Sequence, residues 1–138
     1  MLVLSGSALA QAPCPAEQAN RVRIGAQRFT VEVAATPATR ERGLSGHKRL
    51  APNAGMWFVL PEVGSPGFWM HGMRFSLDLI WVSPEKKVVG VDTLPLCRND
   101  PCPITYPAAP AAYVLEIDAG RFGGRVGDGV EWGCGKVW

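Results

Sequence analysis

The sequence has little excess charge, few histidines and no long hydrophobic run. Lysine and arginine total 14 against 12 acidic residues, so the net charge is only +2. This balance predicts no nucleic-acid partner, because phosphate backbones are bound by strongly basic surfaces. No apolar run reaches the length that crosses a bilayer, so no membrane span is expected. The chain also lacks internal repeats, a G-x-S-x-G motif and a phosphate-binding glycine loop. No motif therefore supports a serine hydrolase or a nucleotide-binding protein.

The first twelve residues, MLVLSGSALAQA, have the pattern of an export signal. The segment is short and apolar, ends in the A-x-A pattern of residues 10–12, and is followed by Pro13. It lacks a basic start, which a truncated or wrongly chosen first residue would explain. The alternative is a first core strand, but the serine, glycine and small-residue content favours the signal. We therefore expect residues 13–138 to form a single globular domain, periplasmic or secreted, that acts as a monomer.

The densest apolar stretch is residues 67–82, GFWMHGMRFSLDLIWV. Its second half alternates, which is typical of a strand with two different faces. A break near Gly72 would divide it into two strands. One face is fully apolar and the other contains a single carboxylate, that of Asp78, so both faces are expected to be buried to some extent.

The rest of the chain also indicates strands, with one short helix. Thr36 and Pro37 have the pattern of a helix N-cap and first helical residue, with Leu44 as the contact to the core. The fold class is therefore α+β and β-dominated, with antiparallel strands forming a barrel or half-barrel. We expect a loop at residues 61–66, one helical turn at 119–124 and a tight turn at 127–129. Further strands are predicted at residues 21–35 (a hairpin), 55–60, 87–94, 113–118 and 130–132.

Four cysteines, at positions 14, 97, 102 and 134, are candidates for disulfides in an exported chain. They allow three pairings. We favour Cys97 with Cys102, within a proline-rich loop, and Cys14 with Cys134, which would join the two ends of the domain. A redox role or a zinc site at Cys97 and Cys102 is less well supported, because the C-x4-C spacing lacks the features that activate C-x-x-C. Free thiols are the remaining alternative.

The candidate ligand-binding residues are polar or aromatic side chains near the central stretch: Arg42, Trp69, His71 and Asp78. If the short helix packs beside the central strand, they would surround a groove for a small ligand or a protein partner. Trp69 would offer a stacking surface. For Asp78 a purely structural role, paired with a cation or accepting backbone hydrogen bonds, is the alternative.

Two further functions from other classes stay open. A hydrolase-like enzyme would use His71 and Asp78 as an acid–base pair, and paired carboxylates at Asp78 and Glu116 are also conceivable. A periplasmic Cu(I) site would use His71, Met73 and Met56, because thioether and imidazole groups favour that ion. Methionine at strand spacing is more often packing, so no cofactor and no resident metal are expected.

Several segments together resemble the family called domain of unknown function 192. Within the central stretch, residues 68–70 and 77–78 match the family's F-W-M and L-D. His71, Gly72 and Met73 stand where the family has Lys-Asn-Thr, and Ser76 replaces a proline. The other matching segments are R-G-L at 42–44, G-M-W-F-V at 55–59, C-x4-C-P at 97–103, V-L-E at 114–116 and G-D at 127–128. The resemblance implies a small, exported, β-rich domain, and it implies no reaction.

Overall fold

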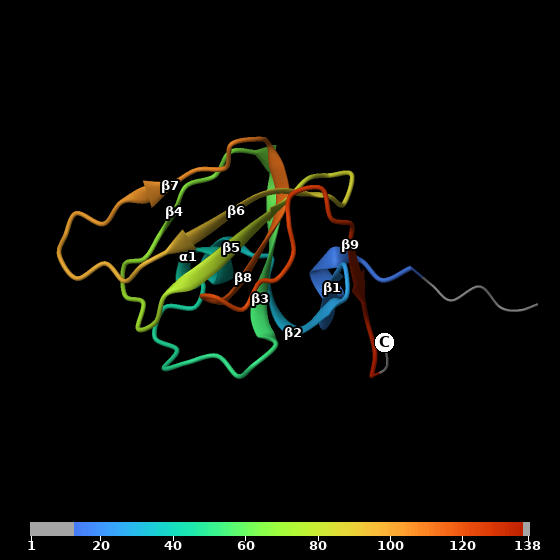
Figure 1. Cartoon of the computed structure of the whole chain (residues 1–138), viewed down its shortest axis with the longest axis horizontal. Helices are drawn as coiled ribbons and strands as arrows, with labels where there is room; N and C mark the ends of the chain where they lie inside the picture. Colours follow the sequence, from blue (N-terminus) through green and yellow to red (C-terminus); the bar gives the residue numbers. More distant parts are fainter. Residues whose placement is uncertain (1–12, 137–138) are drawn as a thin grey trace, which may run out of the picture.

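The strands form one curled seven-stranded sheet and a separate two-stranded sheet (Figure 1). The structure, a computed structural model, describes residues 13–136, so the predicted signal segment at residues 1–12 lies outside the described part. The main sheet has the order β6-β5-β8-β3-β2-β1-β9, and β4 pairs with β7. The elements are η1 (Ala16–Gln18), β1 (Arg21–Ile24), β2 (Gln27–Ala34), α1 (Pro37–Arg42), β3 (Ala54–Gly64), β4 (Phe68–Trp69), β5 (Leu77–Val82), β6 (Val88–Leu94), β7 (Ile104–Thr105), β8 (Ala111–Asp118) and β9 (Val130–Gly133).

The main sheet is a half-barrel, as the strand pattern predicted. Its two edge strands, β6 and β9, meet at one end through backbone hydrogen bonds. The N–H of Val88 donates to the carbonyl of Asp128 at 2.9 Å, and that of Val130 donates to the carbonyl of Lys86 at 2.9 Å. The predicted break in the central stretch is also confirmed, because β4 and β5 are separate strands.

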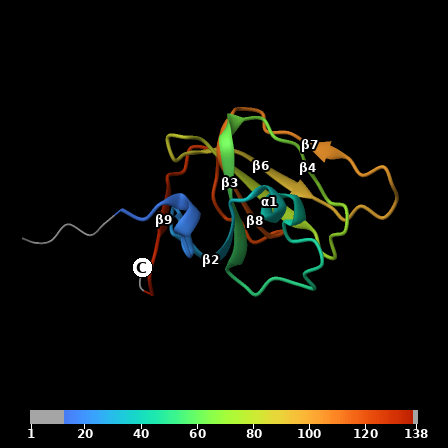
Figure 2. The same cartoon turned by 180° about the vertical axis from the view of Figure 1, so that it is seen from behind.

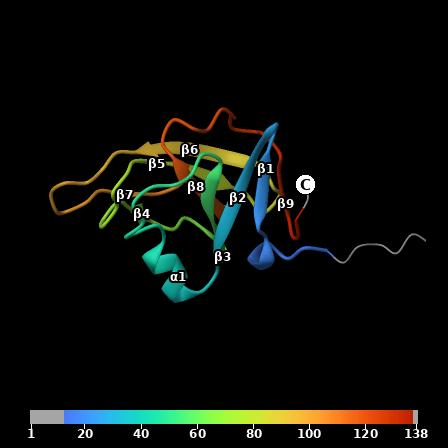
Figure 3. The same cartoon turned by 90° about the horizontal axis from the view of Figure 1, so that it is seen from below.

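One strand pair differs from the antiparallel prediction. Strand β2 pairs with β3 in parallel, because the segment between them, which contains α1, returns the chain to the starting end of the sheet. The predicted helix start is confirmed: Thr36 is the N-cap, its side chain accepts from the N–H of Thr39, and Pro37 is the first helical residue. The helix ends at Gly43, whose φ of +50° favours glycine. Figures 2 and 3 show α1 on the outer side of the half-barrel.

Two local predictions were wrong. Strand β3 continues to Gly64, which pairs with Ala111 of β8 after an irregularity, so residues 61–66 are not all loop. Residues 119–124 form no helical turn. Two of their backbone N–H groups, those of Gly120 and Phe122, donate to the Asp78 carboxylate instead of forming a helical pattern.

The main sheet is covered by apolar residues on both faces. The first core cluster takes side chains from all seven strands and fills the inside of the half-barrel. The second lies on the outer face, where Leu44 after α1 and Met70 after β4 cover strands β3, β5 and β8. This explains why β5 is buried along its whole length rather than on alternate residues.

Both favoured disulfides are present. Cys14 and Cys134, with Cα atoms 5.6 Å apart, join the segment before β1 to the segment after β9. Cys97 and Cys102, with Cα atoms 5.7 Å apart, close a short loop between β6 and β7. Within residues 13–136, no helix has both the length and the apolar character that a membrane span requires.

Candidate functional site

A cavity of about 390 Å³ lies between the outer face of the main sheet and the segments that cover it. Its volume falls within the range of small-molecule sites. Residues of β3 and β8 form one side, which we call the floor. The end of α1, the following turn, and the chain around β4 form the walls and rim. The lining residues are Arg40, Glu41, Arg42, Gly43, Leu44, Ser45, Phe58, Leu60, Pro61, Pro66, Gly67, Phe68, Trp69, His71, Met73 and Glu116.

The floor contains one buried carboxyl group, that of Glu116. Strand β8 lies between β3 and β5, so the cross-strand neighbours of Glu116 are the apolar residues Met56 and Leu79. The residue is only 6% exposed, and within residues 13–136 its carboxyl has no hydrogen-bond or ion-pair partner. Burial without a partner disfavours the charged form and raises the pKa of Glu116 to about 8. At neutral pH the group is therefore mainly a neutral carboxylic acid that can donate a hydrogen bond.

The walls of the cavity are mainly apolar. Phe58 rises from the floor and packs edge-to-face against Phe68, with ring centroids 5.2 Å apart. Gly43 fits closely here, since a Cβ atom at that position would lie 3.3 Å from the Phe58 ring. Leu44 and other apolar side chains complete the walls. Such a surface favours a ligand with an apolar or aromatic body.

The rim combines an aromatic surface with positive charge. The rings of Trp69 and His71 are stacked, with centroids 5.0 Å apart and planes at 26°, and Trp69 is 55% exposed. Arg40 and Arg42 come from α1. Arg40 is partly engaged, because its Nη1 donates to the carbonyl of Val59 at 3.1 Å, whereas Arg42 is exposed.

The structure brings three of the four predicted ligand-binding residues together. Arg42, Trp69 and His71 all line the cavity. Asp78 does not: alternation along β5 places it with Ile80 on the inner face of the half-barrel, whereas the cavity lies on the outer face. The acid–base pair His71–Asp78 and the carboxylate pair Asp78–Glu116 are therefore separated by the sheet.

The Asp78 carboxylate is already occupied by protein donors. Its Oδ1 accepts from the Thr93 hydroxyl at 2.6 Å, and its Oδ2 accepts from the backbone N–H groups of Gly120 at 3.0 Å and Phe122 at 3.4 Å. These contacts tie β5 to β6 and to the segment after β8. They correspond to the structural alternative considered for this residue.

We expect Asp78→Ala to lower the free energy of unfolding by about 2–4 kcal/mol, because two backbone donors and one hydroxyl would lose a buried acceptor. Urea denaturation checks this value. Thr93→Val is the matched variant, since it removes only one of the three hydrogen bonds and should cost about 1 kcal/mol. Unchanged stability in Asp78→Ala would contradict the structural role.

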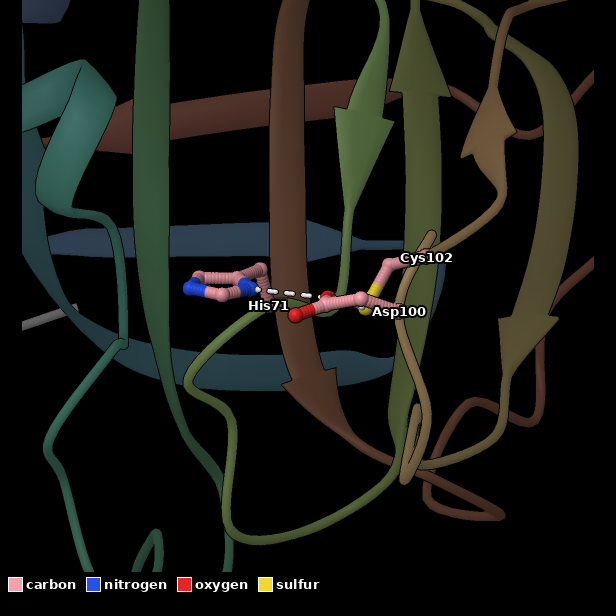
Figure 4. Close-up of side chains that lie close together, drawn as sticks. All are labelled: His71, Asp100 and Cys102. Carbon is pink, nitrogen blue, oxygen red and sulfur yellow. Dashed lines mark hydrogen bonds and ion pairs between the residues drawn. The ribbon is translucent and has the colours of Figure 1, made fainter.

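The arrangement of the candidate metal ligands does not favour a metal site. His71, Asp100 and Cys102 lie together (Figure 4), and the His71 Nδ1 is 3.4 Å from the Asp100 Oδ1. However, Cys102 is bonded to Cys97, so its sulfur is not available as a thiolate ligand. Of the predicted copper ligands, Met73 lines the cavity with His71, but Met56 is buried in the outer core cluster and does not line it.

The comparisons with known proteins bear on the family rather than on a reaction. The family model DUF192, described as Uncharacterized ACR, matches residues 20–132. The chain belongs to this family. The resemblance of the sequence segments to domain of unknown function 192 is thereby confirmed, and the DUF192 match covers all eleven secondary-structure elements except η1 and the last residue of β9.

Two solved structures are similar to this DUF192 chain. One is from Sinorhizobium meliloti 1021 and is provisionally described as a transcription regulator; it has 30% identity and a TM-score of 0.74, covering 81% of this chain and 92% of that chain. The other is a protein of unknown function from Novosphingobium aromaticivorans DSM 12444, with 29% identity and a TM-score of 0.76, covering 92% of this chain and 94% of that chain. No curated protein matches the chain.

The segments that carry the DUF192 resemblance converge on the cavity. They contribute residues 42–44 and 68–69 to the walls and rim, and Phe58 and Glu116 to the floor. Sequence reasoning placed Glu116 in a matching V-L-E segment but did not identify it as a cavity residue. The pattern could not show this, because the role of Glu116 depends on which face of β8 the covering segments lie against.

Proposed function

We propose that the domain binds a small organic anion with an aromatic or apolar body in this cavity. The observation that carries the proposal is a ligand-sized, mainly apolar cavity with an unpaired carboxyl group at its floor and two arginines at its rim. A buried polar group without a partner is costly, so such groups are usually satisfied by water or by a ligand.

Each part of the cavity would recognise a different part of the ligand. The apolar body would lie against Phe58 and the wall residues, and a planar ring would extend over the exposed Trp69. The anionic group would face Arg42, whose guanidinium forms paired hydrogen bonds with carboxylates. His71, stacked on Trp69, would fix the orientation of that ring.

The proposed location is an oxidising compartment, periplasmic or extracellular. Two disulfides involve all four cysteines of the chain. Disulfides of this kind persist mainly outside the cytoplasm. The signal-like segment at residues 1–12 supports the same location.

The proposal can be tested with phenylacetate, 3-phenylpropionate and 4-phenylbutyrate, each compared with its uncharged amide. Binding is followed by chemical-shift changes of backbone amides during titration. We expect the acids to bind, with shifts concentrated in residues 40–45, 58–60 and 66–73. Arg42→Gln should weaken the acids several-fold and leave the amides nearly unchanged, because it removes only the ionic contact.

A matched pair of tryptophan variants locates the site. Leu60→Trp fills the cavity and should abolish binding, whereas Val63→Trp introduces the same side chain on the same strand at a position that is 52% exposed and does not line the cavity. Shifts that are absent for every acid, or that persist in Leu60→Trp, would overturn the proposal.

A further inference from the structure

We infer that the part of the ligand that reaches the cavity floor is a hydrogen-bond acceptor, a ketone, ester or amide oxygen, which accepts from the carboxyl group of Glu116. This inference rests on the proposed function and specifies its ligand class. The ligand would then be an organic anion with a second, uncharged oxygen at its far end. The anionic group would remain at the arginine rim.

Among the floor residues, Glu116 is the one with a polar side chain. A ligand atom that reaches the floor would therefore contact its carboxyl group. The other floor residues, Phe58, Leu60 and Pro61, have apolar side chains. The cross-strand neighbours of Glu116 are Met56 and Leu79, neither of which is a hydrogen-bond donor. A polar ligand atom at this depth loses its water, and Glu116 is the floor residue whose side chain can replace that hydrogen bond.

The protonation state of Glu116 decides which ligand atom fits. A neutral carboxyl group donates one hydrogen bond, whereas a carboxylate only accepts. Because burial raises the pKa of Glu116 to about 8, the donating form dominates at neutral pH. An acceptor oxygen therefore fits at neutral pH and is repelled when the group ionises.

Other charged groups that face the cavity come from two segments. Helix α1 contributes Arg40, Glu41 and Arg42, and the chain after β4 contributes His71. The guanidinium groups stay charged over the whole range in which Glu116 ionises. Variants Glu41→Gln and His71→Gln test the remaining two, and both should retain the pH dependence of the wild type.

The test uses two matched series of acids, each with a chain of one to three carbons between ring and carboxylate so that the distance is sampled. One series carries a 4-acetyl group, and the other a 4-isopropyl group of nearly the same shape without the oxygen. At pH 6.5 we expect the best acetyl acid to bind the wild type about tenfold more tightly than its isopropyl partner, as for a hydrogen bond to a buried group. At pH 9.5 this preference should disappear.

Two variants of Glu116 separate the possible outcomes. Glu116→Gln can still donate through its amide and should keep the acetyl preference at both pH values, whereas Glu116→Leu should lose it at both. Equal binding of the two series to the wild type at pH 6.5 would overturn the inference, as would a pH-dependent preference that persists in Glu116→Gln. If no acid binds at all, the proposed function fails. If the acids bind without an acetyl preference, only the inference fails.

Discussion

Replacing both Cys14 and Cys134 by serine should lower the free energy of unfolding by about 3–5 kcal/mol, because their disulfide closes nearly the whole chain. The two cysteines are 120 residues apart in sequence, so the bond restricts most of the unfolded ensemble. It also joins the segment before β1 to the end of the edge strand β9, which pairs with β1. Urea denaturation and thermal unfolding of the oxidised protein measure the loss, which should appear as a decrease in Tm on the order of 10 °C.

The second disulfide provides the control. Cys97 and Cys102 are 5 residues apart, so the same loop-closure argument gives only about 2 kcal/mol for their double serine variant. A reducing agent should bring the wild type close to the stability of a variant in which all four cysteines are replaced by serine. If both double variants lost the same stability, loop length would not be the cause of the stabilisation.

The limits of sequence reasoning are visible at strand β5. Its pattern predicted the strand and the break before it, because alternation and glycine are local signals. The pattern also gave one fully apolar face and one face with Asp78, and both proved to be buried. It could not show that Asp78 lies on the inner face and the cavity on the outer one. That outcome depends on which face of the sheet is covered by the connection between β2 and β3, which contains α1. The position of this connection is a tertiary property.

The family resemblance gave information that periodicity did not. The matching segments lie far apart in the sequence, and nothing in any one of them predicts a cavity. In the fold, the segment containing Arg42, the segment containing Trp69 and the strand containing Glu116 meet around one space. The parallel β2–β3 pair makes this possible, because the crossover between those strands brings α1 to the outside of the half-barrel. Strand pairing from local turns would have predicted the antiparallel alternative.

Glu116→Gln should make the protein more stable than wild type at high pH and nearly equal at low pH. In the unfolded chain the carboxyl ionises near its ordinary value of 4.5, whereas burial raises the pKa to about 8 in the folded protein. The folded state therefore binds more protons than the unfolded state between these values, and wild-type stability falls as pH rises through this window. Each pKa unit corresponds to about 1.4 kcal/mol, so the difference at pH 9 should be several kcal/mol.

Urea denaturation from pH 4 to pH 9 measures the difference in unfolding free energy between wild type and Glu116→Gln. This difference isolates the Glu116 carboxyl, since the contributions of the other titrating residues cancel. The curve should be flat below about pH 4.5, rise through neutral pH and level off above about pH 8. Glu62→Gln is the matched control: it makes the same change at an exposed position of β3 that does not line the cavity, and it should not reproduce this curve. Parallel stability profiles for wild type and Glu116→Gln would mean that the carboxyl ionises as it does in the unfolded chain. The cavity floor would then be negatively charged at neutral pH, and it would select donors or cations instead of the acceptor oxygen proposed here.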